Sequence, residues 1–154
     1  MSTKPPASVP SSVRIAPAED VDQDALCALY DAVGWSTYTH EPTQLLAAIR
    51  GSDFLVTAVE GDLLIGLARA ISDDSSIAYV QDILVRPTHQ GQGVGRLLLT
   101  AVLDRYKHVR QKVLLTDDRP EQLQFYASMG FKNTRDLTKT PLNAFVIIEG
   151  ASLG

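Results

Sequence analysis

A glycine-dense loop between a strand-like segment and an amphipathic helix is the feature that most constrains this chain. Glycines stand at positions 91, 93 and 95, and without Cβ atoms their backbone N–H groups can converge on an anion. Before the loop, Ile83 and Val85 lie in a β-branched run that stops at Pro87, which cannot donate to a sheet. After it, apolar residues recur at helical spacing as far as Arg105. Three close glycines alone are more often a flexible connection, but their place at a strand-to-helix junction predicts a phosphate cradle.

Two common phosphate loops fit the chain poorly. A Walker loop needs a Gly-Lys-Ser/Thr sequence, which does not occur here. The dinucleotide-binding fingerprint is closer, because Gly91 and Gly93 have its first spacing and Asp117 follows the next expected strand. However, Arg96 replaces its third glycine, and five residues separate the strand from the first glycine. A nicotinamide oxidoreductase is therefore a distant alternative.

The loop resembles the pyrophosphate loop of the GNAT superfamily of N-acetyltransferases, Gln/Arg-x-x-Gly-x-Gly/Ala, at Gln90, Gly93 and Gly95. A second segment, Phe125–Phe131, is similar to the Phe-Tyr-x-x-x-Gly-Phe segment of this family. The resemblance covers roughly residues 13–148 and is nearest to small bacterial and plastid-type members. It implies that acetyl-CoA is the acetyl donor.

The hydrophobic pattern predicts an α+β fold with helices on both faces of a mixed, mostly antiparallel sheet. The resemblance implies that a central parallel pair of strands splays apart to admit acetyl-CoA. We expect strands at Val13–Ala16, Phe54–Val59, Leu63–Ile71, Ile77–Val85, Val113–Thr116 and about Ala144–Ile148, and helices at Val21–Val33, Pro42–Ile49, Gly93–Tyr106 and Pro120–Met129.

Composition bounds the remaining classes. The proline- and serine-rich residues 1–12 are expected to be a disordered leader, and residues 13–154 a single acetyltransferase domain. No segment is apolar enough for a membrane span or a signal core, so we expect a cytoplasmic protein. The net charge of −4 without a basic cluster argues against nucleic acid as a partner. With one cysteine and no Cys/His cluster, no metal is expected.

The resemblance also implies which residues meet the cofactor. The main chain of Ile83, Leu84 and Val85 is expected to pair with the pantetheine arm. Arg119 stands where relatives often have an asparagine, and it could pair with a CoA phosphate or face solvent. The pyrophosphate is expected to bind to Gln90, Gly91, Gln92, Gly93, Val94, Gly95 and Arg96.

Acetyl transfer needs a neutral amine, a donor to the oxyanion and an acid for the leaving thiolate. Tyr126 is the expected acid, although a tyrosine in a helix can simply pack. The backbone N–H of Leu84 is the expected oxyanion donor. Several relatives carry a Glu-Asp pair before the loop, but this chain has Gln81-Asp82, and Gln81 cannot accept a proton. Either Asp82 is the base, or it holds an adjacent loop by hydrogen bonds.

The acceptor amine is expected beside Gln81, against a wall formed by the segment between the first two helices. There, Trp35 and Tyr38 could attract an ammonium or an aryl amine, while Trp35 could equally fill the core. A water chain through Tyr79 or His40 is a further route for the proton.

We therefore expect an N-acetyltransferase acting directly on a primary amine of a small molecule or peptide. A homodimer through the last strand is conceivable. The alternative is a catalytically weak acyl-CoA sensor or interaction module.

Overall fold

A computed structural model describes residues 9–154, which divide into two compact units, one ending at Leu115 and one spanning Thr116–Gly154. Most of the expected leader, residues 1–8, lies outside the described residues. The rest of it makes hydrogen bonds, from Val13 N to Pro10 O at 3.0 Å and from Ser12 Oγ to Glu60 Oε2 at 2.9 Å. The expected leader and single domain stay predictions.

The first unit is built on one five-stranded sheet in the order β1-β2-β3-β4-β5. The first four strands are antiparallel, and β5 pairs with β4 in parallel. This confirms the expected mixed, mostly antiparallel sheet. The strands are β1 (Val13–Pro17), β2 (Phe54–Glu60), β3 (Leu63–Ser72), β4 (Ile77–Val85) and β5 (Gln111–Leu114).

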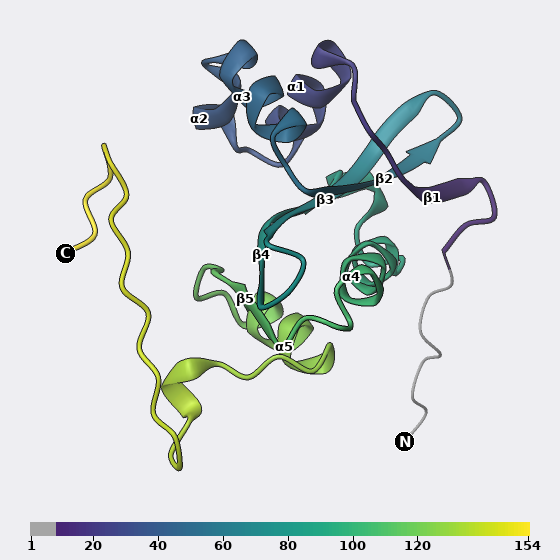
Figure 1. The fold of residues 1–154 in the computed structure, drawn as a ribbon. Helices are drawn as coiled ribbons and strands as arrows, with labels where there is room; N and C mark the ends of the chain where they lie inside the picture. The colour runs from purple at the N-terminus through teal and green to yellow at the C-terminus, as the bar shows by residue number, and fades with distance from the viewer. Residues whose placement is uncertain (1–8) are drawn as a thin grey trace. The chain divides into compact units, whose positions relative to one another are not determined.

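Helices cover both faces of this sheet, as expected (Figure 1). On one face lie α1 (Gln23–Ala32), the short α2 (Ser36–Thr39), which the sequence did not indicate, and α3 (Pro42–Arg50). Asp22 caps α1 by accepting from Ala25 N at 3.0 Å, and Pro42 opens α3. On the other face lies α4 (Val94–Arg105). Each face has its own buried core: Leu26, Leu29, Tyr30, Leu45, Ile49 and Leu67 on the α1–α3 side, and Val56, Ile65, Ala68, Val80, Val94 and Leu98 on the α4 side.

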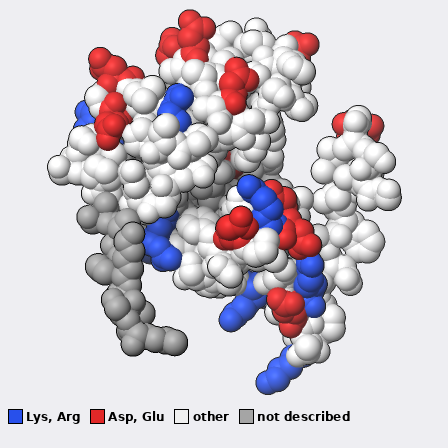
Figure 2. Space-filling model, turned by 180° about the vertical axis from the view of Figure 1, so that it is seen from behind, with Lys and Arg blue, Asp and Glu red and all other residues white. Residues whose placement is uncertain are grey.

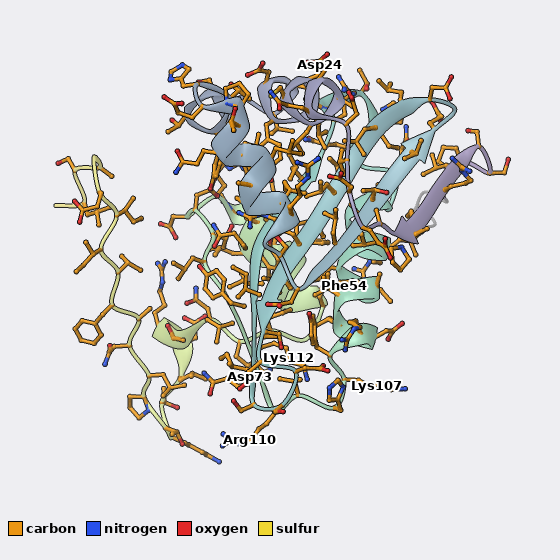
Figure 3. All side chains as sticks on the ribbon, turned by 45° about the horizontal axis from the view of Figure 1, so that its top comes forward. Asp24, Phe54, Asp73, Lys107, Arg110 and Lys112 are labelled. Carbon is orange, nitrogen blue, oxygen red and sulfur yellow. The ribbon has the colours of Figure 1, made fainter. Side chains whose placement is uncertain are left out.

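Figure 3 shows Phe54 at the start of β2 on the side of α4, where its ring meets that of Tyr106 edge-on at 6.1 Å. Nearby, α4 approaches the sheet closely at Gly66. A Cβ atom on Gly66 would stand 3.1 Å from both the Leu84 oxygen and Leu98 Cδ1. Glycine at this position therefore lets α4 pack directly on β3.

Two bulges change which face the side chains meet. Ile65 on β3 has no paired residue in the β2–β3 register, and Gln81 on β4 has none in the β3–β4 register. Before Gln81, Val80 packs on the α4 side, and after it Leu84 packs on the α1–α3 side. A single inserted residue thus exchanges the two faces of β4, and it turns Asp82 toward α1.

The second unit holds α5 (Pro120–Ser128) and a 3-10 turn, Thr134–Asp136. The expected strand at Ala144–Ile148 is wrong: this segment has no strand, and Phe145 and Ile147 are 94% and 89% exposed. A β-branched run becomes a strand only where a neighbour pairs with it. The parallel pair β4–β5 consequently lies at the edge of the described sheet, not at its centre, and a homodimer through the last strand stays a prediction.

Candidate active site

The outer edge of β4 is open beside the glycine loop. β5 pairs with β4 only from Ile77 to Val80, so within the first unit's described residues no strand pairs with the outer edge of Gln81–Val85. A parallel neighbour that stops halfway leaves main-chain N–H and C=O groups to a ligand. This is the splaying that the resemblance implied.

The direction of the peptide groups decides which residues face this edge. Arg86 N donates to Ile65 O on β3 at 2.6 Å. Because a trans peptide places its N–H and C=O on opposite sides, the Val85 carbonyl points away from β3, and Gln90 Nε2 donates to it at 2.9 Å. The register from Asp82 to Val85 is unbroken. Backbone groups therefore alternate, with Ile83 and Val85 on the open edge and Leu84 toward β3.

The glycine loop joins this edge to α4 through a 3-10 turn, η1 (Pro87–His89). Gly91 and Gly93 have φ angles of 75° and 87°, which side-chain-bearing residues rarely adopt. Gly93 is also the N-cap residue of α4, and no side chain caps that end. The backbone N–H groups of Val94 and Gly95 therefore lie at the positive end of the helix dipole, where an anion can bind.

The side chains of the glycine loop differ in their exposure to solvent. Val94 is buried and anchors the loop in the α4 core, whereas Gln90 and Arg96 are exposed. The Gln92 Oε1 atom is buried and has no hydrogen-bond partner among residues 9–154. On the strand side, His89 Nε2 lies 3.1 Å from Glu60 Oε1 and ties η1 to β2. The loop is thus anchored on one side by the buried Val94 and on the other by the His89–Glu60 contact.

Asp82 is the centre of a buried polar network. Its Oδ2 atom accepts hydrogen bonds from Arg69 Nε at 2.6 Å and from the Tyr30 hydroxyl at 2.7 Å. Asp82 is 3% exposed and Arg69 5%. Arg69 also donates through Nη1 to Ser52 Oγ at 3.3 Å. Asp82 thus joins β3 to α1 rather than holding an adjacent loop, and its role as a base stays a prediction.

The pKa values around this network keep the partners in their bonding forms. Burial, followed by the charge of Asp82 and the hydrogen bond to it, raises the pKa of Tyr30 well above its usual range, so its hydroxyl remains a donor. Burial works to lower the pKa of Arg69, but the Asp82 carboxylate outweighs it and the pKa is raised. The guanidinium therefore stays charged.

Tyr30 also joins this network to the expected acceptor wall. Its ring lies 5.8 Å from that of Trp35 and 5.4 Å from that of Tyr38, and these two rings are 6.1 Å apart. Trp35 packs partly against the α1–α3 core, whereas Tyr38 is 37% exposed. Both roles considered for Trp35 thus have a physical basis, and Tyr38 is the open face of the cluster.

The other proton routes lie on the same side of the sheet. Burial, with the nearby Asp82 and Tyr38, raises the pKa of the Tyr79 hydroxyl, so Tyr79 is protonated at neutral pH. His40 is exposed at the C-terminal end of α2. Gln81 is half-buried at the bulge.

Tyr126 and Arg119 belong to the second unit. The Tyr126 ring contacts those of Phe125 and Phe131 at 5.1 and 6.0 Å. Arg119 precedes α5 and pairs with Asp117 at 2.9 Å, with both side chains more than half exposed. The structure brings Ile83, Val85 and the loop together within the first unit, while the roles of Tyr126 and Arg119 stay predictions.

Tyr30 and Arg69 are the residues that the sequence reasoning missed. A signal for Arg69 was present, because it is one charge in the otherwise apolar Leu63–Ile71 run, and Asp82 is one opposite charge in the next strand. Two such charges on neighbouring strands indicate a buried pair. Tyr30 carried no comparable signal.

The family model described as the acetyltransferase (GNAT) domain matches residues 19–141. The chain is 30% identical, over 77% of its length, to an uncharacterized N-acetyltransferase, ycf52, of Gracilaria tenuistipitata var. liui. It is 32% identical, over 73%, to the histone acetyltransferase TAP1 of Glycine max. The matches cover 64% and 53% of these relatives, so the chain spans between half and two thirds of their length.

A solved structure of a GNAT-family acetyltransferase from Streptococcus pneumoniae has the same fold, with a TM-score of 0.74 and 31% identity, covering 90% of this chain and 99% of the other. Another relative, from Arabidopsis thaliana, is named chloroplastic, and the expected cytoplasmic location stays a prediction. None of the described helices is both long and apolar enough to cross a membrane.

Proposed function

Because the chain belongs to the GNAT family of acetyltransferases, we propose that it transfers the acetyl group of acetyl-CoA directly to a primary amine, without a metal. The observation that carries this proposal is the open edge of β4 running into the uncapped N-terminus of α4. An extended thiol arm can pair with the first, and a pyrophosphate can bind at the second.

The cofactor residues follow from the direction of the backbone. Ile83 pairs with the pantetheine arm through its edge-facing N–H and C=O groups, and Val85 through its N–H, because the Val85 carbonyl accepts from Gln90 Nε2. The pyrophosphate binds to the main chain of Gln90–Arg96, where Gly91 and Gly93 give the curve their positive φ angles. Arg119 pairs with a CoA phosphate, exchanging its local partner Asp117 for it.

The reaction is a single displacement. The amine nitrogen attacks the thioester carbonyl carbon, the C–N bond forms, and the C–S bond breaks. The developing oxyanion needs a backbone donor on the open edge, and the N–H of Ile83 meets this condition better than that of Leu84, which faces β3. Tyr126 gives its hydroxyl proton to the leaving thiolate and regains a proton from water.

No free carboxylate of β4 stands ready to take the amine's proton, because Gln81 replaces one and Asp82 is occupied by Arg69 and Tyr30. The ammonium therefore loses one proton to solvent before it attacks. After attack, the nitrogen loses its second proton to water, and that proton restores the Tyr126 hydroxyl. The first contact of the amine is the aromatic cluster of Trp35 and Tyr38.

A cationic amine suits the elements around this wall. Residues 18–50, which include α1–α3, contain six Asp or Glu and one Lys or Arg, and that arginine is paired with Asp20. Figure 2 shows acidic side chains over the part of the first unit where Figure 1 places these helices. A negative field and exposed aromatic faces both raise the local concentration of ammonium groups. Polyamines, aminoglycosides and lysine side chains meet this description.

The occupied Asp82 also favours a second candidate function, an acyl-CoA sensor with little turnover. Replacing Tyr126 by Phe separates the two. For an enzyme, we expect kcat to fall on the order of 100-fold while the Kd for acetyl-CoA stays within twofold. Tyr106→Phe, which removes a buried hydroxyl elsewhere, is the matched control. Equal turnover in all three proteins would remove Tyr126 from the mechanism.

A further inference from the structure

Tyr30 occupies a position that no step of acetyl transfer uses. It is fully buried in α1. Its ring contacts those of Tyr38 in α2 and of Trp35 just before α2. Its hydroxyl donates to Asp82 in β4, which also accepts from Arg69 in β3. A buried tyrosine can pack with its ring alone. The Tyr30 hydroxyl also donates a hydrogen bond to the carboxylate of Asp82, next to the bulge.

The hydrogen bonds of this network connect the two sides of the acceptor site. Arg69 donates to the Ala48 carbonyl in α3 at 3.4 Å and to Ser52 Oγ, just after α3, at 3.3 Å. Tyr30 reaches the other helices through the Trp35 backbone, whose N donates to Tyr30 O at 3.0 Å. Asp82 receives both donors on one oxygen, so moving one partner disturbs the other.

Asp82 links the Tyr30 ring to the open edge of β4. Asp82 lies between the bulged Gln81 and Ile83, whose backbone faces the open edge of β4. The Trp35 ring contacts the Tyr30 ring edge-on, and the Tyr38 ring contacts it at a tilt. A shift of the Tyr30 ring therefore moves the aromatic wall relative to the strand that carries the thioester.

We propose that Tyr30 is a positioning residue, which fixes the aromatic wall of Trp35 and Tyr38 at a set distance from the reacting edge of β4 through its hydrogen bond to Asp82. This rests on the proposed acetyl transfer for its effect on the acceptor. The placement of the wall itself does not depend on that activity.

The chain offers a direct test, because Trp35 is its only tryptophan. Tyr30→Phe keeps the ring and removes the hydroxyl. We expect acrylamide to quench Trp35 emission at least twofold more strongly in this variant, without any substrate present. In amine acetylation, the KM for the acceptor rises at least fivefold, while kcat and the Kd for acetyl-CoA change less than twofold.

Tyr106→Phe is the matched control. Tyr106 is also a buried tyrosine, but it lies on the α4 side of the sheet, and its hydroxyl has no hydrogen-bond partner among residues 9–154. We expect wild-type quenching and KM from it. If Tyr30→Phe behaves like Tyr106→Phe in both measurements, or loses only thermal stability, the proposal is overturned.

Two further observations keep the test decisive. If the wild type acetylates no amine, the proposed function fails, and the quenching comparison still decides the role of Tyr30. If Tyr30→Phe does not fold, NMR of the wild-type protein can measure how fast the Tyr30 hydroxyl proton exchanges with water. A slowly exchanging Tyr30 hydroxyl proton supports the fixed hydrogen bond, and its absence overturns it.

Discussion

At the scale of single residues, the ion pair of Asp82 and Arg69 is the interaction whose loss we expect to destabilise the fold most. Both side chains are withdrawn from water, and each depends on the other to offset its lost hydration. Such a pair is weak as a source of stability while intact. It becomes costly once one partner is removed, because a charge is left buried and unpaired.

Replacing Asp82 by Asn should therefore destabilise the fold by about 3–5 kcal/mol, measured by urea unfolding. Asp20→Asn is the matched control, because it breaks an ion pair with Arg50 whose side chains are 53% and 57% exposed, and little change is expected from it. A stable Asp82→Asn protein with wild-type unfolding would show that the carboxylate is free, and would return it to the role of base.

The residues of the site were only partly predictable. The loop glycines could be identified from sequence because positive φ angles demand glycine, and Gly91 and Gly93 have them. The edge-facing residues could not, since the sequence shows that Ile83, Leu84 and Val85 form a strand but not which N–H groups point outward. That depends on the partner of Arg86 across the ladder.

At the scale of elements, the glycine loop and α4 act as one part. Gly93 ends the loop and begins the helix with a single left-handed residue, and no side chain caps this helix end. The curve of the loop and the start of the helix are therefore set at the same position.

Gly93→Ala should cost about 1–2 kcal/mol of stability, because alanine is strained at a φ of 87°, and it should weaken acetyl-CoA binding at least roughly tenfold. Gly61→Ala is the control: Gly61 has a φ of 60° in the β2–β3 turn, so the strain is similar but lies away from the loop. Calorimetric titration of both variants separates the two effects. Equal acetyl-CoA affinity in both would place the pyrophosphate elsewhere.

Elements with strong periodicity were the easiest to predict. The strand at Ile77–Val85 and the helix at Pro42 were predicted almost to the residue, because alternation and an N-terminal proline are local signals. The bulge at Gln81 and the missing strand at Ala144–Ile148 were not predicted. Both depend on pairing with distant residues, which no local pattern records.

At the scale of the whole molecule, the proposed cofactor and acceptor sites lie on opposite faces of one sheet. The glycine loop leads into α4 on one face. The other face carries the aromatic cluster of Trp35 and Tyr38, and residues 18–50, which form its helices, contain six Asp or Glu and one Lys or Arg. Figure 3 shows Asp24, on α1, pointing outward from this second side. An anionic donor and a cationic acceptor would thus meet the sheet from opposite faces.

The most direct test of the proposed reaction measures thiol release from acetyl-CoA by the purified chain. The acceptors offered are polyamines, aminoglycosides, lysine peptides and neutral aryl amines. We expect turnover above the hydrolysis background, with cationic amines preferred and this preference weakened by salt. If no amine is acetylated while acetyl-CoA still protects the fold against heat, the chain is a cofactor-binding module and the proposed reaction is contradicted.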